Sequence, residues 1–150
     1  MPTPATKTPW FVPTLRKHEK QILGWFDLRI TRRGRRIGVV TFDRVLDART
    51  FYRDLVGTPW GPACSAVVIS GEYVENGNWF RDSDYICLML FLRKHLTFEV
   101  VMHESLHAAF RWAEQTTHRF DPDDEEQLAY AAGRIAEPLV AVFRDAGLLP

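Results

Sequence analysis

The chain has 150 residues, enough for one domain with a hydrophobic core, and its 46% hydrophobic content is ordinary for a globular protein. Its 19 Lys and Arg side chains balance its 19 Asp and Glu side chains, so no overall field attracts nucleic acid or an anionic membrane. Two cysteines without a CxxC spacing indicate no disulfide framework, and the longest apolar run is too short to cross a bilayer. We therefore expect a cytoplasmic protein without a membrane partner.

Residues 1–20 are predicted to form an extended arm, because four of the first 13 residues are proline and no apolar segment of a signal peptide is present. We expect this arm to lie across the surface through Trp10 and Phe11. Residues 21–150 are expected to form a single domain.

Apolar runs bounded by turn residues predict four strands, at residues 25–31, 37–42, 66–70 and 85–91, with a turn at 75–78. The first two strands form a hairpin around an arginine-rich turn, and the third is predicted to be buried. Asp43 is expected to cap a helix that ends near Val56.

Two helices follow the predicted strands. Thr97 is expected to cap a long helix that reaches about Glu114. Asp121 and the proline after it are typical of the start of a second helix, which should reach Glu137 and then bend or restart at Pro138. A small sheet followed by two helices indicates an α+β fold.

The sequence from His103 to His107 is His-Glu-Ser-Leu-His, on the first of these helices. Residues at i and i+4 differ by about 40° around a helix, so both imidazoles project from one strip. Two imidazoles placed in this way can bind one Zn²⁺, and Glu104 beside them can reach a water molecule on the metal. The pattern is HExxH, the helix motif of zinc peptidases.

The rest of the helix helps to decide between a metal site and a chance pairing of two histidines. The apolar side chains share one face, and the two histidines lie opposite it as one strip. Buried imidazoles need polar partners, and a metal ion would supply one. We therefore favour the metal site.

The HESLH helix, with a second helix that opens EEQLAYAAG, resembles a minimal zincin-type metallopeptidase of the gluzincin branch. The resemblance covers about residues 66–137 and implies a zincin-like domain: a small mixed sheet with an edge strand, an active-site helix and a helix that carries a ligand. It implies a peptidase that uses Zn²⁺ and acts on a peptide or protein substrate. His103 and His107 would hold the metal, and Glu104 would move the proton from water to the leaving amine.

In this family the third zinc ligand is a glutamate of the second helix, and we predict Glu126 because 18 residues separate it from His107. Glu126 also lies about 160° from Leu128, on the strip of Tyr130 and Gly133, where the family has a small residue at a helix crossing. The neighbouring acidic residues remain alternatives: Asp123, Asp124 and Glu125.

The resemblance also implies that the strand before the active-site helix is a sheet edge that binds an extended peptide. Tyr85, Cys87 and Met89 of that strand are the predicted substrate-binding residues. His118 is a candidate donor to a transition-state oxyanion, with a surface histidine as the alternative. Tyr130 is a candidate catalytic residue, with a half-buried core tyrosine as the alternative.

Five arginines crowd the first hairpin: Arg29, Arg32, Arg33, Arg35 and Arg36. They could bind the phosphates of a nucleic acid, but we favour a solvated turn, because the net charge is zero and no aromatic side chains are interleaved. The rival to a peptidase is a non-catalytic regulatory or interaction protein that keeps the zincin fold. The oligomeric state is not indicated.

Overall fold

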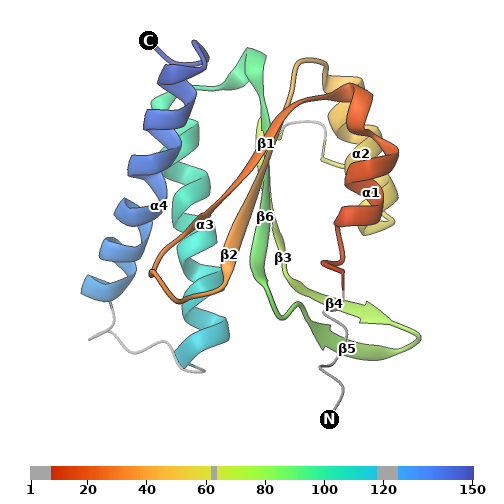
Figure 1. Cartoon of the computed structure of the whole chain (residues 1–150), viewed down its shortest axis with the longest axis horizontal. Helices are drawn as coiled ribbons and strands as arrows, with labels where there is room; N and C mark the ends of the chain where they lie inside the picture. The colour runs from red at the N-terminus through yellow and green to blue at the C-terminus, as the bar shows by residue number, and fades with distance from the viewer. Residues whose placement is uncertain (1–7, 62–63, 118–124) are drawn as a thin grey trace.

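The computed structural model describes residues 8–61, 64–117 and 125–150. Its helices and strands follow the chain in the order shown in Figure 1. They are α1 (Val12–Lys17), β1 (Ile22–Arg29), β2 (Arg36–Phe42), α2 (Val45–Val56), β3 (Ala66–Ser70), β4 (Glu72–Glu75), β5 (Asn78–Arg81), β6 (Tyr85–Leu92), α3 (Phe98–Thr117) and α4 (Glu125–Asp145), with 3-10 turns η1 (Glu19–Gln21) and η2 (Arg93–His95). The fold is mixed α+β, as expected.

A small mixed sheet forms the centre of the molecule, with strand order β1-β2-β6-β3. β1 and β3 are antiparallel to their neighbours, whereas β2 and β6 run parallel. The predicted hairpin of the first two strands is confirmed. In Figure 1, α3 and α4 cover one face of this sheet, and α1 and α2 cover the other.

β6 joins the two halves of the hydrophobic core, because all eight of its residues are buried. Cys87, Met89 and Phe91 pack with α3 and α4, while Leu88 and Leu90 pack with α1 and α2. A continuous apolar run of this kind is typical of a strand covered on both faces.

The N-terminal segment corrects the prediction of an extended arm. Residues 12–17 form α1, and Phe11 and Leu15 are buried in the core between α1, α2 and the sheet. About one helical turn separates Phe11 from Leu15, and the Leu15 amide donates a hydrogen bond of 2.9 Å to the Phe11 carbonyl oxygen, so both side chains point to the same side of α1. α2 ends at Val56 as predicted. The residue at the N-terminal cap of α2 is Arg44, and no side chain makes a cap hydrogen bond there, so the capping role predicted for Asp43 was wrong.

β3 is an edge strand with only its first residue fully buried, so the prediction of a buried strand holds in part. It continues through Gly71 into the β4–β5 hairpin, whose turn residues Asn76 and Gly77 have φ values of 51° and 78°. The predicted turn at 75–78 is thereby confirmed. Among the described residues, no helix is long and apolar enough to span a membrane.

α3 and α4 form an antiparallel pair (Figure 1). The Arg144 guanidinium lies 5.1 Å from the centre of the Phe98 ring, at the end of the pair where α3 begins. At the other end, Trp112 lines a cavity together with Tyr130. α4 is one helix with Pro138 inside it, so the helix continues past the proline.

Candidate metal centre

α3 holds the histidine pair on its solvent side. The helix begins after Thr97, whose Oγ1 accepts a hydrogen bond of 3.2 Å from the Val100 amide, which confirms the predicted cap. Val101 and Ala108 are buried against the sheet, whereas His103 and His107 are exposed, so the expectation that these imidazoles are buried was wrong. The apolar face thus fixes the helix and leaves the histidine strip accessible.

The two imidazoles are arranged as a pair of metal ligands would be. The Nε2 atoms of His103 and His107 lie 3.1 Å apart. Two nitrogens on a tetrahedral zinc, each at about 2.0–2.1 Å, lie roughly 3.3–3.4 Å apart, so the observed spacing is close to that of a shared metal. At this distance one ring can also donate its N–H to the other.

The surroundings of His107 favour its neutral form. Although His107 is exposed, partial desolvation of its ring lowers its pKa, and the charges of His103 and Arg111 lower it further. A neutral imidazole is the form that binds a metal ion, so less proton competition is expected at this position.

Glu104 lies on the same helix but turns toward the sheet. The residue is 7% exposed, and this burial raises the pKa of its carboxyl group, while the charge of His103 acts in the opposite direction. A carboxylate in a desolvated position next to a candidate metal has the properties of a general base.

Glu104 and His103 both line a cleft between the start of β3 and the first turns of α3. Its volume is about 300 Å³. The residues that line it are Cys64, Ser65, Ala66, Glu99, Val100, His103 and Glu104. The sequence did not identify Cys64, Ser65 and Ala66 as part of a site, because their place in the cleft depends on β3 lying at the edge beside α3.

The structure corrects the prediction that the strand before α3 is the sheet edge. β6 pairs with β2 on one side and with β3 on the other, so its backbone is occupied on both sides. Tyr85, Cys87 and Met89 are at most 2% exposed and cannot contact a peptide substrate as predicted. The Tyr85 hydroxyl donates to Asp27, and burial raises the pKa of both Tyr85 and Cys87 to about 12.

The structure does not bring Glu126 to the histidine pair. Glu126 is an exposed residue in the first turn of α4, and because α4 runs antiparallel to α3 (Figure 1), the start of α4 lies toward the end of α3 rather than beside its middle. In the described ranges, no three His, Cys, Asp or Glu side chains are grouped to hold a metal.

Other residues expected near the metal lie elsewhere. Tyr130 is 65% exposed, so it is not a half-buried core residue. It lines a cavity together with Trp112 and residues of the β1–β2 turn, and neither His103 nor His107 lines this cavity. A Cβ atom added at Gly133 would meet nothing within 4 Å, so no close helix crossing occurs there. His118, Asp123 and Asp124 fall outside the described residues.

No family model matches the chain, and neither the curated proteins nor the solved structures include a match to it. The class that the structure defines is an α+β protein with a small mixed sheet. The features of this protein that bear on its function are therefore the side chains of α3 and the cleft beside β3.

Proposed function

We propose that the protein is a zinc-dependent peptidase whose reaction takes place beside His103, Glu104 and His107. The observation that carries this proposal is the 3.1 Å spacing of the two Nε2 atoms next to a buried carboxylate. Both features come from one helix, so their relative positions do not depend on the placement of a loop.

Each side chain has a defined task in peptide hydrolysis. His103 and His107 hold the metal, and bound zinc would polarise the scissile carbonyl group and lower the pKa of a water molecule. Glu104 accepts a proton from the attacking water, whose oxygen forms a bond to the carbonyl carbon. The same proton passes to the amide nitrogen as the C–N bond breaks, which releases a carboxylic acid and an amine.

The free edge of β3 is the place where we propose that the substrate binds. Within the described residues, β3 pairs only with β6, and the cleft that contains Glu104 begins at its first residue, Ala66. An extended peptide can pair with such an edge through its backbone, independently of its sequence. This assigns to β3 the role that the sequence suggested for β6.

The histidines supply two protein ligands. Glu126 in its described position supplies no third, so its assignment as a ligand stays a prediction that this structure does not support. The zinc affinity of the pair is therefore the first quantity to measure.

Glu104→Gln separates the chemical step from metal binding, because glutamine keeps the shape of the side chain but cannot accept the proton. We expect the variant to keep the zinc content of the wild type and to lose cleavage of a mixed peptide library. Glu114→Gln, an exposed position on the same helix, should cleave as the wild type does. Undiminished cleavage by Glu104→Gln would refute the role of Glu104. A wild-type protein that binds zinc and cleaves no peptide would favour the regulatory alternative.

A further inference from the structure

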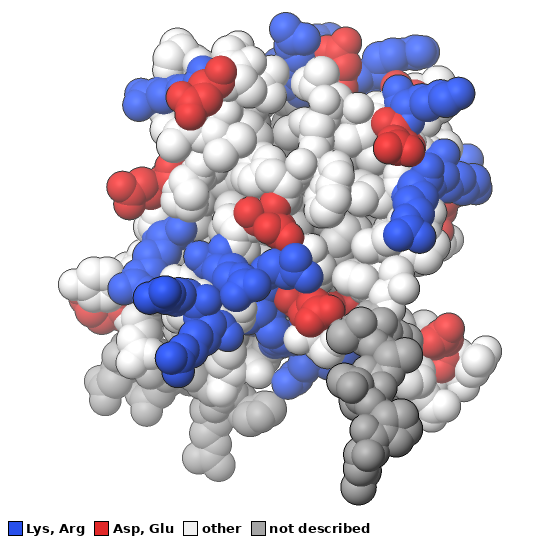
Figure 2. Space-filling model, in the orientation of Figure 1, with Lys and Arg blue, Asp and Glu red and all other residues white. Residues whose placement is uncertain are grey.

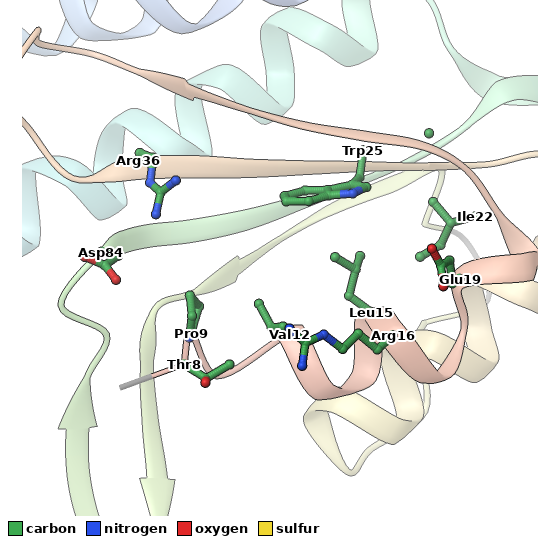
Figure 3. A pocket seen from close by; sticks show the side chains of 11 residues that line it. Thr8, Pro9, Val12, Leu15, Arg16, Glu19, Ile22, Trp25, Arg36 and Asp84 are labelled. Atoms are coloured by element: carbon green, nitrogen blue, oxygen red, sulfur yellow. The ribbon is translucent and has the colours of Figure 1, made fainter. Parts of the chain in front are cut away.

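A second cavity lies on the other face of the sheet, between α1 and β1, with a volume of about 650 Å³. Figure 3 shows the indole ring of Trp25 on β1 lying across this cavity from Val12 and Leu15 of α1. Trp25 is 49% exposed, so a large part of the ring faces open space. The cavity is in the size range of small-molecule sites and has room for a planar ring on the indole.

Charged side chains border this cavity. Arg16 and Arg36 carry positive charge, and Glu19 and Asp84 carry negative charge. Figure 3 places Arg36 and Asp84 at one end of the cavity and Glu19 at the other. The cavity therefore has apolar walls, an aromatic surface and an arginine within reach of both.

Arg36 and Asp84 also line an adjoining polar cavity of about 250 Å³ at the β1–β2 turn. Arg29, Arg33 and Arg35 complete its cationic lining. Figure 2 shows Lys and Arg side chains gathered over this turn. The two cavities thus share Arg36 and Asp84 in their linings, with an aromatic surface in one and an arginine cluster in the other.

Hydrogen bonds hold several of these arginines in place while leaving positive charge uncompensated. Arg29 donates to the carbonyl oxygen of Arg32, and Arg35 donates to Gln115 and to the carbonyl oxygen of Asp82. Arg36 pairs with Asp27 at 2.9 Å. Within the described part of the chain, the other four arginines of the hairpin make no ion pair with a carboxylate.

The structure also removes one reason for regarding the arginine turn as merely solvated. From the sequence, no aromatic platform was evident among the arginines. In the fold, Trp25, Asp27 and Arg29 alternate along β1 and therefore point to the same face, with Trp25 and Arg29 about 13 Å apart and the Asp27–Arg36 ion pair between them. An aromatic ring on which bases can stack, next to arginines that can bind phosphates, is the usual arrangement for single-stranded nucleic acid.

We propose that this face of β1 binds a single-stranded nucleic acid, with one base stacked on Trp25 and the neighbouring phosphates on the arginine cluster. A chain fits better than a free nucleotide, because the arginines extend from the Trp25 cavity into the adjoining one. This binding does not depend on the proposed peptidase activity, since the histidine cleft lies at β3, the opposite edge of the sheet.

Fluorescence anisotropy with short labelled single-stranded DNA and RNA, at several salt concentrations, tests this proposal on the full chain. Trp25→Ala should weaken binding about fivefold or more, and Trp25→Phe should retain most of it, because phenylalanine still stacks. Arg33→Ala should reduce the slope of log K against log salt by about 0.7, the share of one phosphate contact. Arg49→Ala removes an equal charge from the exposed surface of α2 and should change neither quantity.

Circular dichroism of each variant verifies that the fold is kept, which is expected because these side chains are exposed or half-exposed. The proposal is overturned if neither single-stranded DNA nor single-stranded RNA binds at low salt. It is also overturned if Trp25→Ala and Arg33→Ala bind the oligonucleotides with the same affinity and salt dependence as Arg49→Ala. It is equally overturned if a mononucleotide binds as tightly as the oligonucleotide, or if duplex DNA of the same length binds as tightly as the single strand.

Discussion

The Nε2 atoms of His103 and His107 face each other at 3.1 Å on the exposed strip of α3, and His103 also lines the cleft that begins at β3. The pair is positioned by the buried face of its own helix. Its geometry therefore requires only that α3 be a helix packed on the sheet.

Removal of either imidazole should weaken zinc binding, because each supplies one metal–nitrogen bond. We expect His103→Ala and His107→Ala each to lower the zinc affinity by at least about tenfold, the lower end of what even outer-sphere substitutions cost. Competition with a chromophoric chelator measures this change. His95→Ala, at an exposed histidine of η2, is the control and should bind as the wild type does. If all three variants bound zinc as tightly as the wild type does, the histidine pair would be excluded as a metal site.

The two cysteines should react very differently with a thiol reagent. Cys64 is exposed in the cleft, whereas Cys87 is 0% exposed in β6 and burial raises its pKa to about 12. The thiolate is the reactive form, so the folded protein should show one fast-reacting thiol, and the unfolded protein two. Mass spectrometry of the labelled peptides identifies the site. Rapid modification of Cys87 in the folded protein would show that β6 is not enclosed as described.

The contact between α1 and α2 should depend on pH through Asp54. Its Oδ2 atom lies 2.9 Å from Lys17 Nζ and 2.7 Å from His18 Nε2. Hydrogen bonds from Lys17, and then from His18, lower the pKa of Asp54. A lowered carboxyl pKa stabilises the fold above the usual pKa of aspartate, and this contribution is lost as the pH falls through the lower value.

Asp54→Asn should therefore unfold at a lower temperature than the wild type at pH 7, and the difference should shrink in acid. Thermal unfolding followed by circular dichroism between pH 7 and pH 2 measures the difference in unfolding temperature at pH 7 and its decrease in acid. A difference that stays constant over this range would mean that the charge of Asp54 does not contribute.

Two glycines offer a matched test of the sheet corner. A Cβ atom at Gly71 would collide with the carbonyl oxygens of Tyr85 and Ile86, where the chain leaves β3, whereas one at Gly133 on α4 would meet no atom within 4 Å. Gly71→Ala should lower the free energy of unfolding by about 2–4 kcal/mol. Gly133→Ala should raise it by about 0.5–1 kcal/mol, because alanine favours a helix. Urea titration distinguishes these results, and a tolerated Gly71→Ala would contradict the close packing of this corner.

Local signals predicted the elements that depend on neighbouring residues. The hairpin turn at Asn76 and Gly77 and the cap at Thr97 follow from residues a few positions apart, and both are confirmed. The histidine strip follows from helical spacing in the same way. These features need no knowledge of the order of the strands.

The features that depend on long-range arrangement could not be obtained in this way. Whether β6 lies inside the sheet or at its edge depends on β3, whose pairing no local pattern encodes. The uninterrupted apolar run of β6 is typical of an interior strand, whereas its predicted place at the edge came from the family resemblance alone. Similarly, the distance between Glu126 and the histidines depends on how far α3 extends before the chain turns back.

The most direct test of the metal centre is the zinc content of the purified full-length protein beside that of the His103→Ala/His107→Ala double variant. Elemental analysis after dialysis against buffer with a small excess of Zn²⁺ gives both values. We expect one zinc per wild-type chain and essentially none in the double variant, with both proteins folded by circular dichroism. A wild-type protein that retains no zinc, or a double variant that retains as much as the wild type, would contradict the assignment of this pair as a metal site.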